Sequence, residues 1–256
     1  MDRNTVEKRR AYRRKKAKKR RLIVGFIFFG LVVLSITVAL TLTVLFPVKK
    51  IDYIGNKVYS DEQLAENLNI KGKNIFVLSE KTVTEDARKK LPYIKDVGIS
   101  KKFPDAVSVK ITEAKDFAAY QVGSVYYMIS EDGYVLAEKQ TKPENVIEIR
   151  AREVKQTVGE KVDYSDDTSR EVVETIINNL KKNNIKIDYI DVKSATDINS
   201  GIMNGRFKVV FGTKLNIDKK TDHLCEMIKS IDGAEKGTIN LSLWSESDPV
   251  GRFIKE

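Results

Sequence analysis

The segment from Leu22 to Phe46 constrains this chain more than any other feature, because its 25 residues include no charged side chain. At about 1.5 Å per residue, a helix of this length is longer than the roughly 30 Å hydrocarbon core of a bilayer. Its serine and threonine hydroxyls are tolerable there, because each can donate a hydrogen bond to the carbonyl one turn back. The apolar part of a cleaved signal peptide is shorter, about 7–15 residues, and ends at a small-residue site that this segment lacks. We therefore predict one uncleaved transmembrane helix over residues 22–46.

The positive charge of the chain is concentrated before this segment. Residues 1–21 hold 12 Lys/Arg and two acidic residues, whereas the remaining 235 residues hold 34 of each sign, so the formal net charge of +10 belongs to the tail. Positive charge beside a membrane helix keeps that side in the cytoplasm, and each basic residue near the surface contributes about 1 kcal/mol of attraction to anionic lipid. We predict a basic cytoplasmic tail over 1–21 that contacts lipid, a single-pass type II protein in the cell membrane, and no nucleic-acid binding.

The sequence contains few of the residues that bind metals or react as thiols. The chain has one cysteine, Cys225, and one histidine, His223. A single cysteine cannot form an internal disulfide, and a single histidine leaves the usual zinc ligand sets incomplete. Two residues apart on a helix, the two side chains point to different faces. We predict structural roles for both residues, no metal site and no cofactor.

Two acidic pairs are the remaining candidates for acid–base chemistry, Asp166 with Asp167 and Glu246 with Asp248. An acidic residue at the start of a helix is explained more simply by its interaction with the helix dipole. No nucleophile or base is identified beside either pair. The sequence therefore predicts a protein that is not an enzyme, with no catalytic residues and no small-molecule substrate.

The first outer part, residues 48–115, has the pattern of a small α/β unit. Ser60 and Gln63 form a capping box at the start of one helix, and Pro92 ends a second helix whose apolar residues recur every four positions. The expected elements are a strand over 48–54, helices after Ser60 and Ser79, and strands over 94–102 and 106–113. A β-α-α-β-β order of this length favours a three-stranded sheet backed by two helices.

The second outer part, residues 116–244, is richer in strands. Alternating and short apolar runs predict strands over 117–122, 125–129, 134–136, 146–150, 187–192, 206–211 and 238–243. Apolar stripes predict helices over 168–182 and 219–231. The strand at 238–243 is the last clear one, so residues 245–256 are expected to form a loose C-terminal tail.

Several short motifs together resemble a known family. In chain order they are 51–56 (IDYIGN), 72–76 (GKNIF), 91–97 (LPYIKDV), 103–104 (FP), 111–114 (ITEA), 129–135 (ISEDGYV), 211–214 (FGTK) and 237–242 (GTINLS). Their order behind one apolar segment resembles the FtsQ/DivIB family of bacterial cell-division proteins, whose first outer domain is a POTRA domain. Tyr93 stands where that family often has tryptophan. The resemblance implies an α+β protein in which a transmembrane helix precedes a POTRA domain and a mixed β-rich domain with two helices.

The resemblance also implies a function. It predicts a non-enzymatic scaffold of the divisome at the division septum, which links septum assembly to peptidoglycan synthesis. Its expected partners are proteins of the FtsB/DivIC and FtsL types, bound outside the membrane.

An edge strand is the means of partner binding that this resemblance suggests, because its free backbone N–H and C=O groups can pair with a strand of another protein. The resemblance places partner capture at the C-terminal strand. The candidate residues are Thr238, Ile239, Asn240, Leu241, Ser242, Leu243 and Trp244. Trp244, the only tryptophan, either anchors the interface or folds back onto the core.

Two other functions share parts of this pattern. An extracytoplasmic cell-wall enzyme would use the acidic residues of the second outer part. A secretion or transport component would share the POTRA domain, but it would normally carry several such domains or a β-barrel, whereas this chain has one domain and no long series of strands. The scaffold is the function that we expect.

Overall fold

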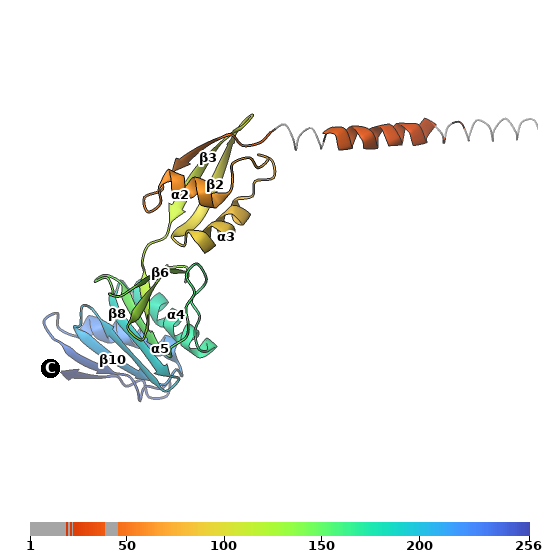
Figure 1. Ribbon diagram of the computed structural model, residues 1–256. Coiled ribbons are helices and arrows are strands. Elements are labelled where there is room, and N and C mark those ends of the chain that lie inside the picture. The colour runs from red at the N-terminus through yellow and green to blue at the C-terminus, as the bar shows by residue number, and fades with distance from the viewer. Residues whose placement is uncertain (1–18, 20, 22, 39–45) are drawn as a thin grey trace, which may run out of the picture. The chain divides into compact units, whose positions relative to one another are not determined.

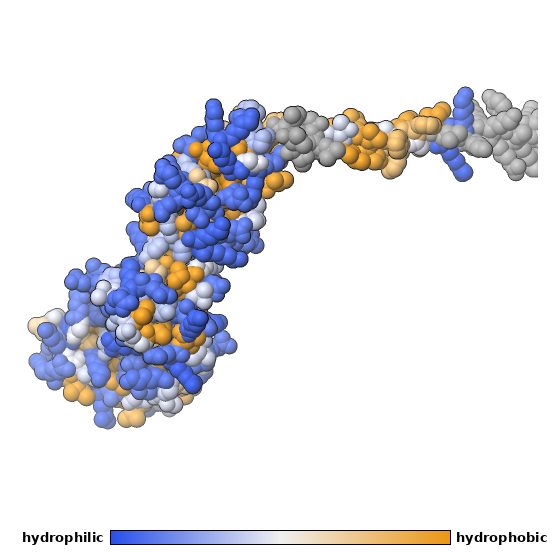
Figure 2. Space-filling model, viewed as in Figure 1, coloured by the Kyte–Doolittle hydropathy of each residue, from blue (hydrophilic) through white to orange (hydrophobic). Residues whose placement is uncertain are grey.

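The computed structural model describes residues 19, 21, 23–38 and 46–256. Residues 23–38 are helical, and Figure 2 shows their surface as mostly apolar. Two of the predicted hydrogen bonds from hydroxyl groups to the preceding turn lie within these residues. Ser35 Oγ donates to Val32 O at 2.8 Å, and Thr37 Oγ1 donates to Val33 O at 2.9 Å. Within the described parts of the chain, no helix combines the length and the apolar character needed to cross a bilayer. Leu22, residues 39–45 and most of the predicted basic tail lie outside the described residues.

The chain divides into two compact units. The first consists of Met1–Ile54, Asn69–Ser79 and Ile99–Val109, and the second of Gly55–Leu68, Glu80–Gly98 and Lys110–Glu256. Strands β2 and β3, described next, contribute residues to both.

The predicted β-α-α-β-β order is confirmed in the first part of the chain (Figure 1). Its elements are β1 (Lys50–Ile54), α2 (Asp61–Leu68), α3 (Glu80–Lys90), β2 (Ile94–Lys102) and β3 (Ala106–Glu113), and the three-stranded sheet has the order β1-β3-β2. The capping box also forms as predicted, since Ser60 N–H donates to Gln63 Oε1 at 2.9 Å and Gln63 N–H donates to Ser60 Oγ at 3.3 Å. α3 ends at Lys90, two residues before Pro92, in agreement with the predicted role of this proline as a helix end.

A nine-stranded mixed sheet forms the second part. Its strands are β4 (Ala118–Val122), β5 (Val125–Ile129), β6 (Val135–Lys139), β7 (Ile147–Ala151), β8 (Ile187–Ser194), β9 (Asp197–Ile202), β10 (Phe207–Gly212), β11 (Gly237–Asn240) and β12 (Arg252–Lys255). Their order across the sheet is β12-β11-β10-β9-β8-β7-β4-β5-β6. The pairs β4–β7, β7–β8 and β10–β11 are parallel, and the other neighbours are antiparallel.

Two helices cover one face of this sheet, α4 (Asp167–Lys182) and α5 (Ile217–Ser230) (Figure 1). The apolar stripe predicted for α4 is confirmed. Ile177 packs against the core, and the other four stripe residues are buried in it, Val172, Val173, Ile176 and Leu180. From the sheet, alternate residues of β10 point into this core and are fully buried, Phe207, Val209 and Phe211. Burial of one side of each strand against the two helices explains why the alternation of β10 is readable in the sequence.

Strand β9 was missed by the sequence analysis. Its sequence, Asp-Ile-Asn-Ser-Gly-Ile, is poor in residues that favour strands, but β8 and β10 pair with both of its sides. Gly201 is needed here, because a Cβ at this position would lie 2.2 Å from Cε1 of Tyr189 on the neighbouring strand. The strand therefore forms through its neighbours and not through its own propensity.

Strand β12 was also missed, and the expectation of a loose tail over 245–256 is wrong for residues 252–255. Phe253 turns inward from this strand, and its ring meets that of Phe207 edge-on at a centroid distance of 5.9 Å. A four-residue strand with one inward aromatic has too short a pattern to be recognised in the sequence.

Candidate partner-binding surface at the C-terminal strands

The seven predicted partner-binding residues lie on and directly after β11. Thr238, Ile239 and Asn240 belong to the strand, and Leu241 extends it by donating its N–H to Val210 O at 2.8 Å. Ile239 and Leu241 are fully buried in the core beneath the sheet. Ser242, Leu243 and Trp244 then leave the sheet in a turn, in which Leu243 is 77% exposed.

The expectation that β11 is an edge strand is wrong. It pairs in parallel with β10 on one side and antiparallel with β12 on the other. Both sides of its backbone are therefore used within the chain. A partner strand cannot pair with Thr238–Asn240 while β12 is in place, and the edge of the sheet at this end is β12.

The position of β12 depends on a close approach to β11. A Cβ on Gly237 would lie 2.1 Å from Ile254 O, a distance that no real side chain could keep. The chain entering β12 is equally close to α5, because a Cβ on Gly251 would lie 2.3 Å from Met227 Sδ. Two glycines thus allow the last strand to close onto the sheet.

The outer side of β12 offers backbone groups for pairing. Glu256 N–H donates to Lys236 O at 3.1 Å, on the side of β11. Because backbone groups point to alternate sides along a strand, Lys255 N–H points away from β11 to the open edge. The side chain of Ile254 is 55% exposed. Among the described residues no strand pairs with this side of β12, so the edge combines open backbone groups with one apolar side chain.

Trp244 packs against the core beneath the sheet. It is partly buried there, and its ring centroid lies 6.3 Å from that of His223 on α5. Its indole N–H is buried and has no hydrogen-bond acceptor among the described residues. The ring thus contributes to the core, although part of it remains accessible.

Lys220 fixes α5 to the end of β10, next to this surface. Its side chain is buried, and its Nζ donates to Phe211 O at 2.8 Å and to Thr213 O at 2.9 Å. Burial lowers the pKa of this amine. Sequence analysis did not single out Lys220, because a lysine in an amphipathic helix is normally read as a solvent-exposed residue.

The residues considered for catalysis have structural partners. Asp166 caps α4 by accepting the N–H of Ser169 at 2.7 Å, and this hydrogen bond lowers the pKa of its carboxyl group. Glu246 forms an ion pair with Lys219. Burial raises the pKa of the Cys225 thiol, which disfavours the reactive thiolate. Among the described residues, no group of three or more His, Cys, Asp or Glu side chains could hold a metal ion.

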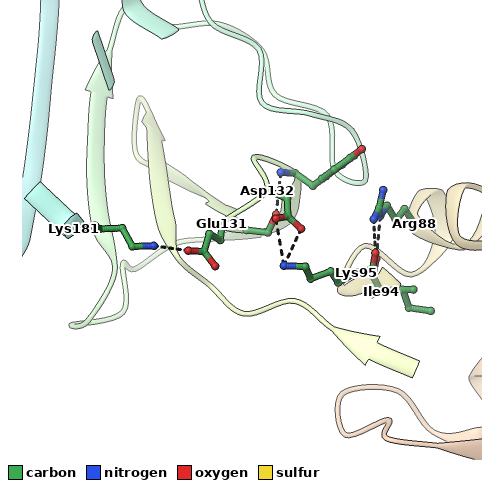
Figure 3. Close-up of polar contacts among 8 residues, drawn as sticks. Arg88, Ile94, Lys95, Glu131, Asp132 and Lys181 are labelled. Atoms are coloured by element: carbon green, nitrogen blue, oxygen red, sulfur yellow. Dashed lines mark hydrogen bonds and ion pairs between the residues drawn. The ribbon is translucent and has the colours of Figure 1, made fainter. Parts of the chain in front are cut away.

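A set of polar contacts within the second unit, drawn in Figure 3, was also missed. Lys95 at the start of β2 binds Asp132 in the β5–β6 turn, with 3.1 Å between Nζ and Oδ2. The neighbouring Glu131 pairs with Lys181 of α4, which lowers the pKa of its carboxyl group. Arg88 donates to Ile94 O at 3.3 Å. The sequence places residues 131–133 only between the predicted strands 125–129 and 134–136, because ion pairs between distant segments leave no local pattern.

Comparisons with known proteins agree with this architecture. The family described as POTRA domain, FtsQ-type, matches residues 46–114. The chain is 26% identical to the cell division protein DivIB of Clostridium botulinum (strain Hall) over 246 residues, which cover 93% of each protein. It is 28% identical to DivIB of Clostridium acetobutylicum, with 80% of this chain and 82% of that one covered. For DivIB of Bacillus subtilis the identity is 25%, with coverages of 94% and 88%. The chain thus contains an FtsQ-type POTRA domain and is similar over about nine tenths of its length to bacterial cell division proteins named DivIB.

Proposed function

We propose that this chain is a bitopic scaffold of the bacterial division machinery. In this proposal residues 22–46 anchor it in the cell membrane, the basic tail lies in the cytoplasm, and the two sheets lie outside at the division septum. It binds partners of the FtsB/DivIC and FtsL types and thereby links septum assembly to peptidoglycan synthesis, without catalysing a reaction itself.

Three features support this proposal. The relatives that match most of the chain are named cell division proteins. The uncharged segment after a tail with 12 Lys/Arg has the length and the charge asymmetry of an N-in membrane anchor. Three of the four acidic residues considered for catalysis have structural partners: Asp166 caps α4, and Asp167 and Glu246 form ion pairs.

The single observation that carries the binding mode is the open edge of β12. An extended segment of a partner would pair with it as a tenth strand, since main-chain hydrogen bonds provide affinity in this mode. The predicted residues Thr238–Trp244 enter this proposal as the support of that edge, because β11 holds β12 in position. Ile254, an exposed residue of β12 itself, supplies an apolar contact there.

The test is a matched pair of variants at Lys255. Lys255→Pro removes the N–H that points to the open edge, whereas Lys255→Ala keeps this N–H and removes only the ion pair with Glu235. Full-length protein is co-expressed with an FtsB/DivIC-type partner, and the two are co-purified from membranes. We expect Lys255→Pro to reduce the recovered partner about tenfold, since one lost backbone hydrogen bond is worth up to about 1.4 kcal/mol.

Lys255→Ala should retain partner recovery. Equal recovery with both variants would overturn pairing at β12. No recovery of any such partner with the wild-type chain would overturn the scaffold function itself.

A further inference from the structure

Three phenylalanines gather at one place in the first unit, although they come from three separate segments. The ring centroids of Phe46 and Phe76 are 5.4 Å apart, those of Phe76 and Phe103 are 5.3 Å apart, and those of Phe46 and Phe103 are 6.5 Å apart. Phe76 is 48% exposed, Phe103 is 59% exposed, and the adjacent Val77 is 67% exposed. We call these four residues the aromatic tip. An exposed apolar cluster can mark a site that contacts a membrane or another protein.

The aromatic tip is attached directly to the end of the uncharged segment. Phe46 is the last residue of that segment, and its carbonyl accepts the N–H of Ile75 at 3.0 Å. Pro47 pairs with Asn74 in an isolated bridge. These backbone contacts hold Phe76 beside Phe46. If one of the two rings enters a membrane, the other must therefore lie at a similar depth.

Lysines surround the same place. The three short segments that supply the rings and their neighbours, residues 46–50, 73–77 and 101–105, contain five lysines and one aspartate. Lys101 Nζ lies 3.5 Å from Phe76 O. Lysine side chains commonly lay their apolar stems along an apolar surface and extend their ammonium groups to phosphates or water.

We propose that the aromatic tip lies in the headgroup layer of the bilayer from which residues 22–46 emerge, with the surrounding lysines at anionic lipid headgroups. This inference rests on the membrane anchor of the proposed function. If Phe46 ends a transmembrane segment, it lies at the interface, and rings centred 5–7 Å from it lie in the same layer, which is about 5–7 Å thick on each side of the hydrocarbon core. Phenylalanine is among the apolar residues that interfacial protein segments bury at the boundary between headgroups and acyl chains.

A protein partner is the less suitable occupant for this surface. Any partner that covered Phe76 and Phe103 would have to occupy the layer next to Phe46, which the lipid headgroups already fill if the segment spans the membrane. The excess of lysines also matches the negative charge of phosphatidylglycerol headgroups, because lysines near an anionic membrane surface are attracted to it.

The test places a tryptophan at the aromatic tip and measures its contact with lipid. In a Trp244→Phe background, which removes the only native tryptophan, Phe76→Trp and Phe103→Trp are compared with Ile54→Trp. Ile54 is a matched control, because it is 51% exposed in the same unit, about 13 Å along β1 from Lys50 at 3.3 Å per residue. The full-length variants are reconstituted into phosphatidylcholine vesicles with bromine on the upper acyl chain. Circular dichroism confirms that each variant is folded.

Fluorescence quenching of Phe76→Trp and Phe103→Trp should exceed that of Ile54→Trp at least about twofold, because the interfacial layer is so thin. Adding phosphatidylglycerol should increase the difference, and Lys101→Glu should reduce that increase. Resistance to extraction by alkaline carbonate, measured on the same samples, tests the anchor separately. Extraction of the protein would overturn the proposed membrane anchor. Retention in the membrane with equal quenching at all three positions would overturn the aromatic tip alone.

Discussion

The aromatic tip and the β12 edge are both exposed, but they expose different parts of the chain. At the tip the exposed groups are side chains, the rings of Phe76 and Phe103 with Val77 beside them. At the edge they are backbone groups, such as the outward N–H of Lys255. Binding through exposed apolar side chains is non-directional, so any apolar surroundings can cover such a surface. Binding through a backbone edge is directional, because only an extended strand can pair with its alternating donors and acceptors.

The two regions should therefore respond to different substitutions. The tip tolerates exchange of one aromatic residue for another and is sensitive to loss of apolar area or to reversal of charge. The edge tolerates exchange of its outward side chains and is sensitive to proline and to anything that moves β12 away from β11. The following predictions test this division, and they are ordered from the largest expected effect to the smallest.

The largest effect is expected at Gly237. In Gly237→Ala the new Cβ would lie 2.1 Å from Ile254 O and 3.0 Å from Lys255 Cα, so β12 must move away. Overpacking of this kind costs about 1–3 kcal/mol, and we expect the free energy of unfolding in urea to fall by about 2 kcal/mol. Hydrogen exchange should show faster exchange of Glu256 N–H, which donates to Lys236 O in the wild type.

Gly233→Ala is the matched control, because a Cβ there would meet no atom within 4 Å. Its free energy of unfolding should stay within about 0.5 kcal/mol of the wild type. If Gly237→Ala left both the stability and the exchange of Glu256 unchanged, the edge would not depend on the close approach of β12.

A smaller and pH-dependent effect is expected at Asp166, whose carboxylate caps α4 under the nine-stranded sheet. Asp166→Ala should lower the free energy of unfolding by about 1 kcal/mol at pH 7, the usual cost of losing an N-cap. The cap lowers the carboxyl pKa in the folded state, so its contribution is present above the unfolded-state pKa of about 3.9 and is lost as the pH falls through the folded-state value.

Urea unfolding between pH 7 and acid pH measures this contribution. The difference between wild type and Asp166→Ala should stay constant down to about pH 5 and shrink below about pH 4. Asp166→Asn keeps an acceptor that does not titrate, and its difference from Asp166→Ala should not shrink. A wild-type difference that grew on acidification would contradict the capping role. Partner recovery should be the same for all three proteins, because none of them alters β12.

An element of this fold can be predicted from the sequence when the residues that determine it lie within or next to it along the chain. Strands β2, β3 and β5 begin and end at the predicted residues. Their signals are local, because the apolar residues and the adjacent turns that indicate them lie within or directly beside each segment. The capping box of Ser60 and Gln63 is local in the same sense. Strand β9, in contrast, forms because β8 and β10 hold it, and Asp197 to Ile202 by themselves contain little evidence of it.

The candidate surfaces follow the same rule. The sequence directed attention to Thr238–Trp244, but whether a strand is an edge is a property of the sheet order, which here is decided by Arg252–Lys255 further along the chain. The aromatic tip was not predicted, because Phe46, Phe76 and Phe103 are far apart in the sequence and only the fold brings their rings together.

The smallest effect on stability is expected from the double variant Phe76→Ser with Phe103→Ser. Both rings are about half exposed in the wild type, so their removal takes little apolar area out of a packed interior, and the free energy of unfolding should change by less than about 0.5 kcal/mol. Urea unfolding of the full-length protein in detergent measures this value. A loss of about 2 kcal/mol or more would mean that the rings belong to the core, as expected of buried aromatic residues. The tip and the edge would then differ in packing as well as in the groups they expose, and the tip's exposure would no longer argue for contact with lipid.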